Sequence, residues 1–414
     1  MLHSINGSAL GLALGHNGNQ PTNNKGFVVT KSYQNTAQFI GQEAPLESFY
    51  CLSKGALAKQ VQRFKTGFSG VVAYAVKANP TSELVSGLAA CCVNAYDVAS
   101  IPEVALVRAT IPDADIMYDN PVKSQDEITR AYHEFGVKSY ALDDVGEFTK
   151  IDSIIGSDES VQLTVRFKIP SNTAKYDLSQ KFGADEALSV RLLKMVAAAG
   201  YRCGLTFHPG SQCSDVSAYS EYIEKAAEIA KEAGVPIVSL NVGGGFPSRY
   251  LGEELPNLED YFRAIGESFE KAFAGTDTTL ISEPGRCLVD SCISLLCQVK
   301  HRREDQTLFI NDGVYGGFME QLFSPIVHPV RAFRGKKELT GDCGAYTVWG
   351  PTCDSLDVLA HQPILPMDIG EGDWLEFGLM GGYGSSTATQ FNGFTSNRYV
   401  FVEEGFPYPD GVLN

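Results

Sequence analysis

The amino-acid sequence predicts an eight-fold (β/α) barrel, of the TIM-barrel type, joined to a second, all-β domain. Two observations lead to this prediction. Short apolar runs alternate with helical segments eight times in the first two thirds of the chain, which is what a barrel of parallel strands requires. After about Arg286 the pattern changes to alternating apolar and polar residues separated by turns, which is typical of β-structure.

The expected barrel strands are short, apolar and rich in β-branched or aromatic residues. They lie at Val71–Val76, Val93–Tyr96, Asp115–Tyr118, Ser139–Leu142, Val161–Phe167, Arg202–Phe207, Ile237–Asn241 and Thr279–Ser282. Amphipathic helical stretches, for example 124–135, 186–200, 219–234 and 258–273, separate several of them. A doubly wound open sheet is the competing architecture, and the count of eight strands favours the barrel.

The domain boundaries follow from these patterns. We expect residues 1–26, rich in Gly and Asn, to be a mobile N-terminal segment. Residues 45–285 would form the barrel. Residues 27–44 would join residues 286–414 in the all-β domain, because the strand-like run that begins at Phe27 has no partner in the barrel.

Composition limits the classes of function. The chain has 414 residues, of which 44% are hydrophobic and 20% charged, with a formal net charge of −16. Its cations are not clustered, so nucleic acid is not an expected partner. Without a basic leader or a long apolar stretch, we expect a cytoplasmic protein that does not enter a membrane. Ten cysteines and seven histidines show no ligand spacing, so no metal site is predicted.

A lysine stands at the end of the first barrel strand, in the motif YAVKANP. Active sites of such barrels lie at the C-terminal ends of the strands, which gives Lys77 a candidate chemical role. A lysine at a strand end can simply extend into solvent. Alternatively, loss of solvent would make its amine reactive toward a carbonyl group, with formation of a Schiff base.

Three further motifs follow later strands and would meet Lys77 at the same end of the barrel. NVGGGFP at 241–247 contains glycines that let backbone N–H groups approach an anion. SEPGR at 282–286 places Glu283 at the barrel mouth, and FHPGSQ at 207–212 places His208 there. A turn, a surface ion pair and a structural histidine are the alternatives for each motif taken alone. Their convergence on one mouth favours a phosphate-bearing cofactor site.

Taken together, the motifs YAVKANP, YDVAS, TVRFKI, FHPGSQ, NVGGGFP, SEPGR, NDGVYGGF, WGPTCDSLD and GGYGSSTATQFNGF resemble those of a known enzyme family. This is the ornithine/diaminopimelate/arginine decarboxylase family of pyridoxal-phosphate enzymes, which have an alanine-racemase-type barrel. The resemblance covers roughly residues 45–395 and is closest to the ornithine decarboxylases.

The resemblance implies a role for each matching residue. Lys77 would hold pyridoxal 5'-phosphate covalently, and His208 would stack on its ring. Glu283 would pair with the ring nitrogen, where a carboxylate favours the protonated ring, a stronger electron sink. Racemases of this fold have an arginine there, so Glu283 favours decarboxylation. The other residues implied to contact the cofactor are Asp97, Arg166, Ser211, Gly245, Gly285, Arg286 and Tyr383.

Cys353 would act across a subunit boundary. Such a cysteine is often only a small buried apolar residue. In the family, however, the thiol comes from the second subunit and returns a proton to the α-carbon after CO2 leaves, as a general acid. A homodimer with shared active sites is therefore implied, and Lys181 and Asp357 occupy positions of a cross-subunit ion pair in relatives.

The resemblance also indicates the substrate. Asp354 follows the cysteine, as in ornithine-type enzymes, where a short carboxylate faces the distal ammonium of the substrate. Phe323 or Ser324 occupies the place of the usual second acid, which leaves Glu320 as the nearby carboxylate. The implied substrate-binding residues are Asp354, Glu320 and Tyr315.

Conversion of L-ornithine to putrescine, a step of polyamine biosynthesis, is the first expectation. Decarboxylation of lysine, arginine or another diamino acid is the alternative. A racemase and an inactive regulatory homologue remain as further alternatives.

Overall fold

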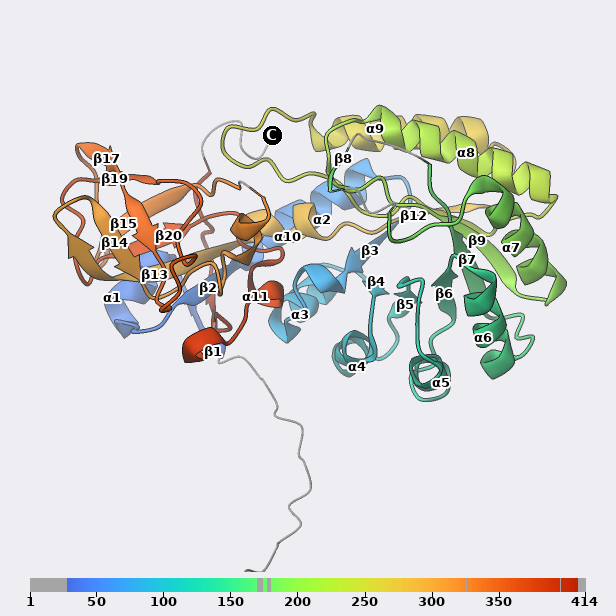
Figure 1. The fold of residues 1–414 in the computed structure, drawn as a ribbon, viewed down its shortest axis with the longest axis horizontal. Helices are drawn as coiled ribbons and strands as arrows, with labels where there is room; N and C mark the ends of the chain where they lie inside the picture. Colours follow the sequence, from blue (N-terminus) through green and yellow to red (C-terminus); the bar gives the residue numbers. More distant parts are fainter. Residues whose placement is uncertain (1–27, 170–173, 177–179, 325, 395, 409–414) are drawn as a thin grey trace, which may run out of the picture.

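The computed structural model describes residues 28–169, 174–176, 180–324, 326–394 and 396–408 of the chain. The predicted mobile segment, residues 1–26, lies outside them. Figure 1 shows a barrel domain, on the right, beside a domain built mainly of strands, on the left. None of the helices in the described ranges is both long and apolar enough to cross a membrane.

Eight parallel strands form a closed barrel in the order β3-β4-β5-β6-β7-β9-β11-β12. Closure comes from β12, which pairs with β3 so that Ile281 lies beside Val71. The predicted barrel is therefore confirmed, and the open doubly wound sheet is excluded. The strands are β3 Val71–Ala75, β4 Ala95–Val98, β5 Asp115–Tyr118, β6 Ser139–Leu142, β7 Gln162–Arg166, β9 Arg202–Thr206, β11 Ser239–Asn241 and β12 Thr279–Ser282.

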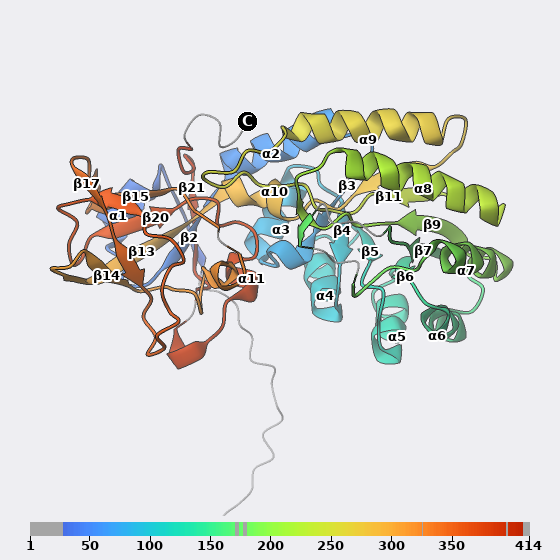
Figure 2. The same ribbon diagram turned by 45° about the horizontal axis from the view of Figure 1, so that its top comes forward.

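Helices surround the barrel because each has one apolar face. In α9, for example, Leu258, Tyr261, Phe262 and Ile265 are buried. Figure 2 shows α8 and α9 running side by side along the barrel. The surrounding helices are α2 Lys54–Gly67, α3 Ser82–Ala90, α4 Ile101–Thr110, α5 Gln125–His133, α6 Val145–Ile155, α7 Glu186–Ala198, α8 Ser217–Ala233 and α9 Leu258–Ala272.

The second domain is built on a nine-stranded sheet that collects strands from both ends of the chain. Its main order is β1-β21-β2-β13-β20-β15-β16, while β14 pairs with β13 and β18. The helix α1 (Thr36–Glu43) packs Phe39 and Ile40 against one face of this sheet. The strands are β1 Val28–Tyr33, β2 Phe49–Ser53, β13 Ile293–Arg303, β14 Thr307–Ile310, β15 Val330–Arg334, β16 Lys337–Glu338, β18 Thr347–Trp349, β20 Trp374–Phe377 and β21 Tyr399–Val402.

One strand lies in a different domain from the one expected. The strand β2 falls inside the range predicted for the barrel, but it pairs with β13 and β21 in the second sheet. All five of its residues are buried, and a strand buried on both faces lacks the alternation of apolar and polar residues that would mark it as part of the second sheet. The barrel domain therefore begins with α2, at about residue 54, rather than at residue 45.

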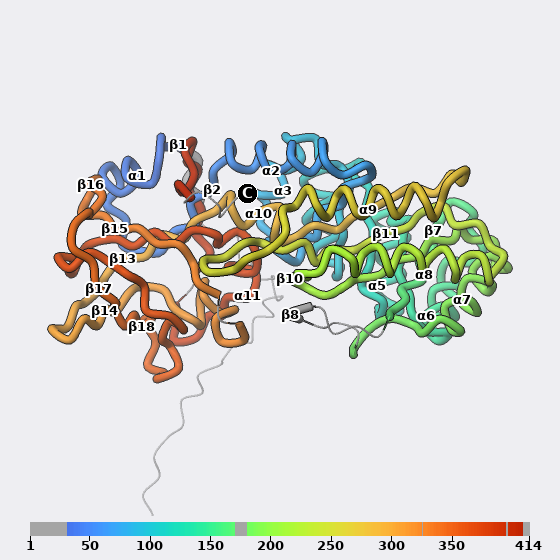
Figure 3. The backbone as a smooth tube through the Cα atoms, turned by 90° about the horizontal axis from the view of Figure 1, so that it is seen from above, coloured from blue at the N-terminus to red at the C-terminus, as the bar shows by residue number. Residues whose placement is uncertain are grey.

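The two domains share a continuous hydrophobic core, which includes Tyr50 of β2, Tyr74 of β3 and Leu295 of β13. Figure 3 shows the second domain against one side of the barrel. The backbone N–H of Tyr383 donates to the carbonyl of Ala78 at 2.7 Å, so a loop of the second domain reaches the barrel mouth. The remaining short elements are η1 Val76–Ala78, β8 Ala174–Tyr176, β10 Ser211–Cys213, α10 Arg286–Val289, η2 Asp290–Cys292, η3 Met319–Leu322, β17 Cys343–Ala345, β19 Ile364–Pro366, α11 Gly384–Thr387 and η4 Phe391–Gly393.

Candidate active site

A cavity of about 490 Å³ opens where the barrel strands end. Because parallel strands all end at one mouth, side chains that are far apart in the sequence meet there. All ten residues predicted to contact the cofactor line this cavity, namely Lys77, Asp97, Arg166, His208, Ser211, Gly245, Glu283, Gly285, Arg286 and Tyr383.

Lys77 and Asp97 form an ion pair in this cavity, with 3.0 Å between Nζ and Oδ2. Loss of solvent disfavours the charged amine, but the electrostatic effect of Asp97, followed by those of Tyr383 and Glu283, outweighs this and raises the pKa of Lys77. Burial raises the pKa of Asp97 to about 6, although the Lys77 ammonium acts in the opposite direction.

Glu283 lies deeper in the same cavity, together with a carboxylate that sequence reasoning missed. The amide nitrogen of Asn241 donates to Glu283 and, at 3.2 Å, to Asp119. Burial, followed by the charge of Asp119, raises the pKa of Glu283 to about 8. Asp119 directly follows the strand β5, so the strand-end reasoning that selected Glu283 could also have selected Asp119.

His208 is held as a neutral ring facing the cavity. The backbone N–H of Gly210 donates to its Nδ1 at 3.0 Å, which fixes the orientation of the imidazole. Burial, together with the positive charges of Arg166 and Lys77, lowers the pKa of His208 well below its usual value. A neutral, oriented imidazole in a cavity wall can stack on a planar aromatic ligand.

Glycines and a buried arginine shape one part of the wall. Gly245 has a φ of +90°, and a Cβ there would lie 2.4 Å from the carbonyl oxygen of Gly210. Arg286 is 6% exposed, and its Nε has no hydrogen-bond partner among the described residues. The remaining guanidinium nitrogens donate to Tyr250 Oη at 2.8 Å and to both carboxylate oxygens of Glu320, at 2.6 and 2.5 Å. The guanidinium also lies over the ring of Tyr383, with 4.6 Å to its centroid.

Of the other predicted residues, Lys181 lines the cavity, whereas Tyr315, Cys353 and Asp354 lie together outside it. The hydroxyl of Tyr315 donates to Asp354 Oδ2 at 2.6 Å, and this bond, with another from the backbone of Leu356, lowers the pKa of Asp354. Cys353 is exposed next to Asp354. In the described part of the chain, Tyr315, Cys353 and Asp354 are not among the residues that line the cavity. Glu320 does line the cavity, but Arg286 engages both of its oxygens.

Within one chain, Asp357 holds the backbone of a turn. It is buried, and its carboxylate accepts hydrogen bonds from the backbone N–H groups of Val314 and Thr352, both at 2.9 Å. In this chain it therefore orders the turn that carries Cys353 and Asp354.

Comparison with known proteins agrees with this geometry. A family model described as the pyridoxal-binding domain of pyridoxal-dependent decarboxylases matches residues 54–290, more than half of the chain. The chain belongs to the pyridoxal-dependent decarboxylase family. It is an enzyme that decarboxylates an amino acid, and its cofactor is pyridoxal 5'-phosphate.

Several relatives of this decarboxylase are similar over most of their length. Decarboxylase flvG of Aspergillus flavus is 31% identical over 388 residues, which span 89% of this chain and 88% of that protein. The lysine/ornithine decarboxylase of Selenomonas ruminantium is 33% identical over 343 residues, spanning 80% and 84%. The crystal structure of the arginine decarboxylase of Paramecium bursaria Chlorella virus bound to agmatine superposes with a TM-score of 0.79, at 26% identity and with 88% and 98% coverage.

The residues of the decarboxylase cavity fit pyridoxal phosphate. The Gly245 turn leaves no room for a side chain, and the buried Nε of Arg286 needs an acceptor, which a phosphate oxygen would supply. Lys77 offers the amine that binds an aldehyde, His208 offers a neutral ring for stacking, and Glu283 offers a carboxyl group to a ring nitrogen. Each end of the cofactor would therefore meet a group of matching chemistry.

Proposed function

We propose that this decarboxylase acts on a basic amino acid, with L-ornithine as its substrate and putrescine as its product. The observation that carries the proposal is the Asp354 carboxylate, held by Tyr315 at 2.6 Å with its pKa lowered. A carboxylate fixed in its charged form attracts an ammonium group through charge-assisted hydrogen bonds. The net charge of −16 also favours the approach of cationic molecules.

Asp354 reaches the cavity from a second copy of the chain in this proposal. In one chain Lys77 and Glu283 line the cavity, whereas Cys353 and Asp354 lie on an exposed turn outside it. Two copies related by a twofold axis would each place this turn over the other's barrel mouth. Exposed apolar side chains near the turn support a contact surface there, namely Leu322, Phe323, Leu356, Phe391 and Phe394.

Glu320 is not free to hold the distal ammonium in this arrangement. Both of its oxygens accept hydrogen bonds from Arg286, and that pair is part of the cavity wall. Asp354 would then bind the ammonium without a second carboxylate. This leaves L-lysine, L-arginine and other diamino acids as alternatives, and a lysine/ornithine decarboxylase is among the relatives.

The proposed roles divide the reaction among named groups. Lys77, Asp97, Arg166, His208, Ser211, Gly245, Glu283, Gly285, Arg286 and Tyr383 would hold pyridoxal phosphate. When bound, the cofactor supplies a conjugated ring that accepts the electron pair left on the α-carbon as CO2 departs.

The protein's own groups control charge and proton delivery around that ring. Glu283 would stabilise positive charge at the ring nitrogen. The neutral imidazole of His208 would fix the orientation of the ring. The thiol of Cys353 from the second copy would deliver a proton to the α-carbon. We also propose a cytoplasmic location and a place in polyamine biosynthesis.

A substrate panel tests the proposed function. The loaded enzyme is incubated separately with L-ornithine, L-lysine, L-arginine and diaminopimelate, and both CO2 and the product amine are measured. We expect the highest kcat/KM with L-ornithine. Higher kcat/KM with another basic amino acid overturns the choice of ornithine, and no turnover of any of them overturns the whole proposal. Chiral analysis of recovered substrate distinguishes racemisation.

A further inference from the structure

Asp119 and Glu283 form a buried carboxyl pair in the wall of the cavity. They are 9% and 7% exposed, and they come from the ends of different strands, β5 and β12. The carboxyl oxygens of Asp97, Asp119 and Glu283 lie within 4.8 Å of one another. Two carboxyl groups this close together can hydrogen-bond to each other only if one of them carries a proton.

The surroundings of the pair supply one hydrogen-bond donor to each carboxyl group. The side-chain amide of Asn241 donates one hydrogen to Asp119 and the other to Glu283, while its oxygen accepts from the backbone N–H of Gly243 at 2.9 Å. The second oxygen of Asp119, Oδ1, is buried without a hydrogen-bond partner in the described part of the chain. Two charged carboxylates in this place would lack the donors that they need, so one proton shared between them is the stable state.

Charged groups from the adjacent elements do not remove this proton. Lys77 is paired with Asp97 at 3.0 Å, so the two charges nearest to the pair largely cancel. Arg166 and His208 line the same cavity, and His208 is neutral. The charge of Lys123 favours ionised Asp119, but less than burial opposes it, and its ammonium bonds to other groups, as described below. Consistently, burial and the neighbouring carboxylate raise the pKa of Glu283, and burial raises that of Asp119.

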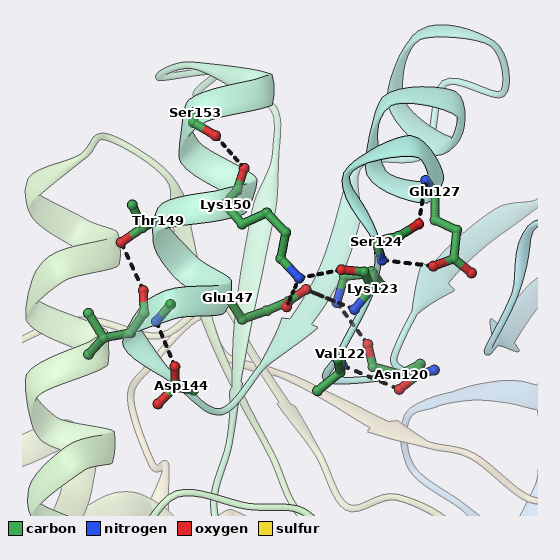
Figure 4. A network of polar contacts seen from close by, with 12 residues as sticks. Asn120, Val122, Lys123, Ser124, Glu127, Asp144, Glu147, Thr149, Lys150 and Ser153 are labelled. Carbon is green, nitrogen blue, oxygen red and sulfur yellow. Dashed lines mark hydrogen bonds and ion pairs between the residues drawn. The ribbon is translucent and has the colours of Figure 1, made fainter.

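The loop that begins at Asp119 is held tightly, so the pair cannot separate to relieve its repulsion. The buried ammonium of Lys123 donates to the carbonyl of Asn120 at 2.8 Å (Figure 4). It also donates to the carbonyl of Ala141 at 2.7 Å. Lys123 also pairs with Glu147, at 3.2 Å. These contacts tie the loop after β5 to the strand β6 and the helix α6, and they keep the Asp119 carboxyl group beside Glu283.

We propose that Asp119 is a positioning residue that shares one proton with Glu283 while the cavity is free of cofactor, and that this proton leaves the pair when pyridoxal phosphate binds. The inference rests on the proposed position of Glu283 at the ring nitrogen. The O–H bond of the pair breaks as the carboxylate of Glu283 meets the nitrogen. The proton moves to the nitrogen if that atom arrives unprotonated, and to solvent if it arrives protonated.

Counting protons tests the inference without measuring catalysis. The cofactor-stripped full chain is titrated with pyridoxal 5'-phosphate at pH 7, by calorimetry in two buffers of different ionisation enthalpy. The wild type should release about one proton per site more than Asp119→Asn, because the variant lacks the shared proton. This difference is the same whichever protonation state the ring nitrogen has on arrival, and the contribution of Lys77 is common to both proteins. Equal proton release by the two proteins overturns the inference.

A matched control separates this effect from a general change of charge. Asp115→Asn removes an exposed carboxylate at the other end of the same strand, β5, and should release as many protons as the wild type. Loss of the extra proton in both variants would overturn the inference, because the effect would then not belong to the Asp119–Glu283 pair.

Infrared spectroscopy of the wild type gives a second test that needs no variant to fold. The cofactor-stripped chain should show a C=O stretching band of a protonated carboxyl group, and the band should disappear on loading. Absence of the band before loading overturns the inference. Failure of the proposed function is recognised separately: loading would still abolish the band of the protonated carboxyl group, but no basic amino acid would be decarboxylated.

Discussion

Replacing Gly245 by alanine should weaken cofactor binding more than it lowers the stability of the fold. Gly245 lies in the turn after β11 with a φ of +90°, which residues with a side chain adopt only at a cost of about 1–2 kcal/mol. The new Cβ would also lie 2.4 Å from the carbonyl oxygen of Gly210, so one of the two backbones must move. Relief of such overpacking costs about 1–3 kcal/mol.

The movement would disturb the phosphate cradle directly. The carbonyl of Gly245 accepts a hydrogen bond from the backbone N–H of Cys213 at 2.9 Å, and this bond joins the turn to the segment that carries Ser211. If about 1.5–3 kcal/mol of the total cost falls on the cofactor-bound geometry, the affinity for pyridoxal phosphate decreases roughly 10–100-fold. Titration of the stripped protein, followed by absorbance, measures this decrease.

Gly252→Ala is a matched control. Gly252 has a similar φ of +80°, but a Cβ there would meet no atom within 4 Å. Both variants should therefore lose a comparable amount of thermal stability from the backbone strain, whereas only Gly245→Ala should bind the cofactor weakly. Equal cofactor affinities in the two variants would refute the conclusion that close contact with Gly210 shapes the cradle.

Three further outcomes are expected. The variants Lys77→Ala and Cys353→Ala should each be inactive alone. When equal amounts are mixed and the subunits exchange, about half of the dimers carry one intact site out of two, so about a quarter of wild-type activity should return. No recovery after verified exchange would contradict shared sites. Asp354→Asn should raise KM for L-ornithine roughly 10–100-fold, from loss of an ionic hydrogen bond of about 1.5–3 kcal/mol, with a smaller change in kcat in steady-state assays; an unchanged KM argues against contact with the ammonium. Burial lowers the pKa of Lys123 from 10.5 to about 8. Between these two pH values the lysine is protonated in the unfolded chain but not in the folded chain. The free energy of unfolding should therefore rise with pH in this range, by up to about 3 kcal/mol relative to Lys123→Met. The measurement is the denaturation midpoint of the wild type and of Lys123→Met from pH 7.5 to 10.5. A difference between the two midpoints that does not change with pH would show that Lys123 does not titrate in this range.

Most of the cofactor site could be predicted because its residues follow strand ends. Lys77, His208 and Glu283 each stand just after an apolar run, and a barrel brings all such positions to one mouth. Asp119 has the same local pattern but lacked a motif that marked it. The engagement of Glu320 by Arg286 could not be predicted, because the two residues are 34 positions apart and neither sequence neighbourhood specifies the partner.

Local patterns in the amino-acid sequence were enough to predict the alternation of strands and helices, the change to β-structure near Arg286, and the residue types at the strand ends. These features are local: hydrophobic periodicity and turn residues act over a few positions. Tertiary structure alone decided that β2 joins the second sheet, that Lys77 is charged beside Asp97, and that Asp119 meets Glu283. Each of these depends on which distant backbone segments lie side by side and on how much solvent they exclude, and burial together with neighbouring charge sets the protonation of every acid and base in the cavity.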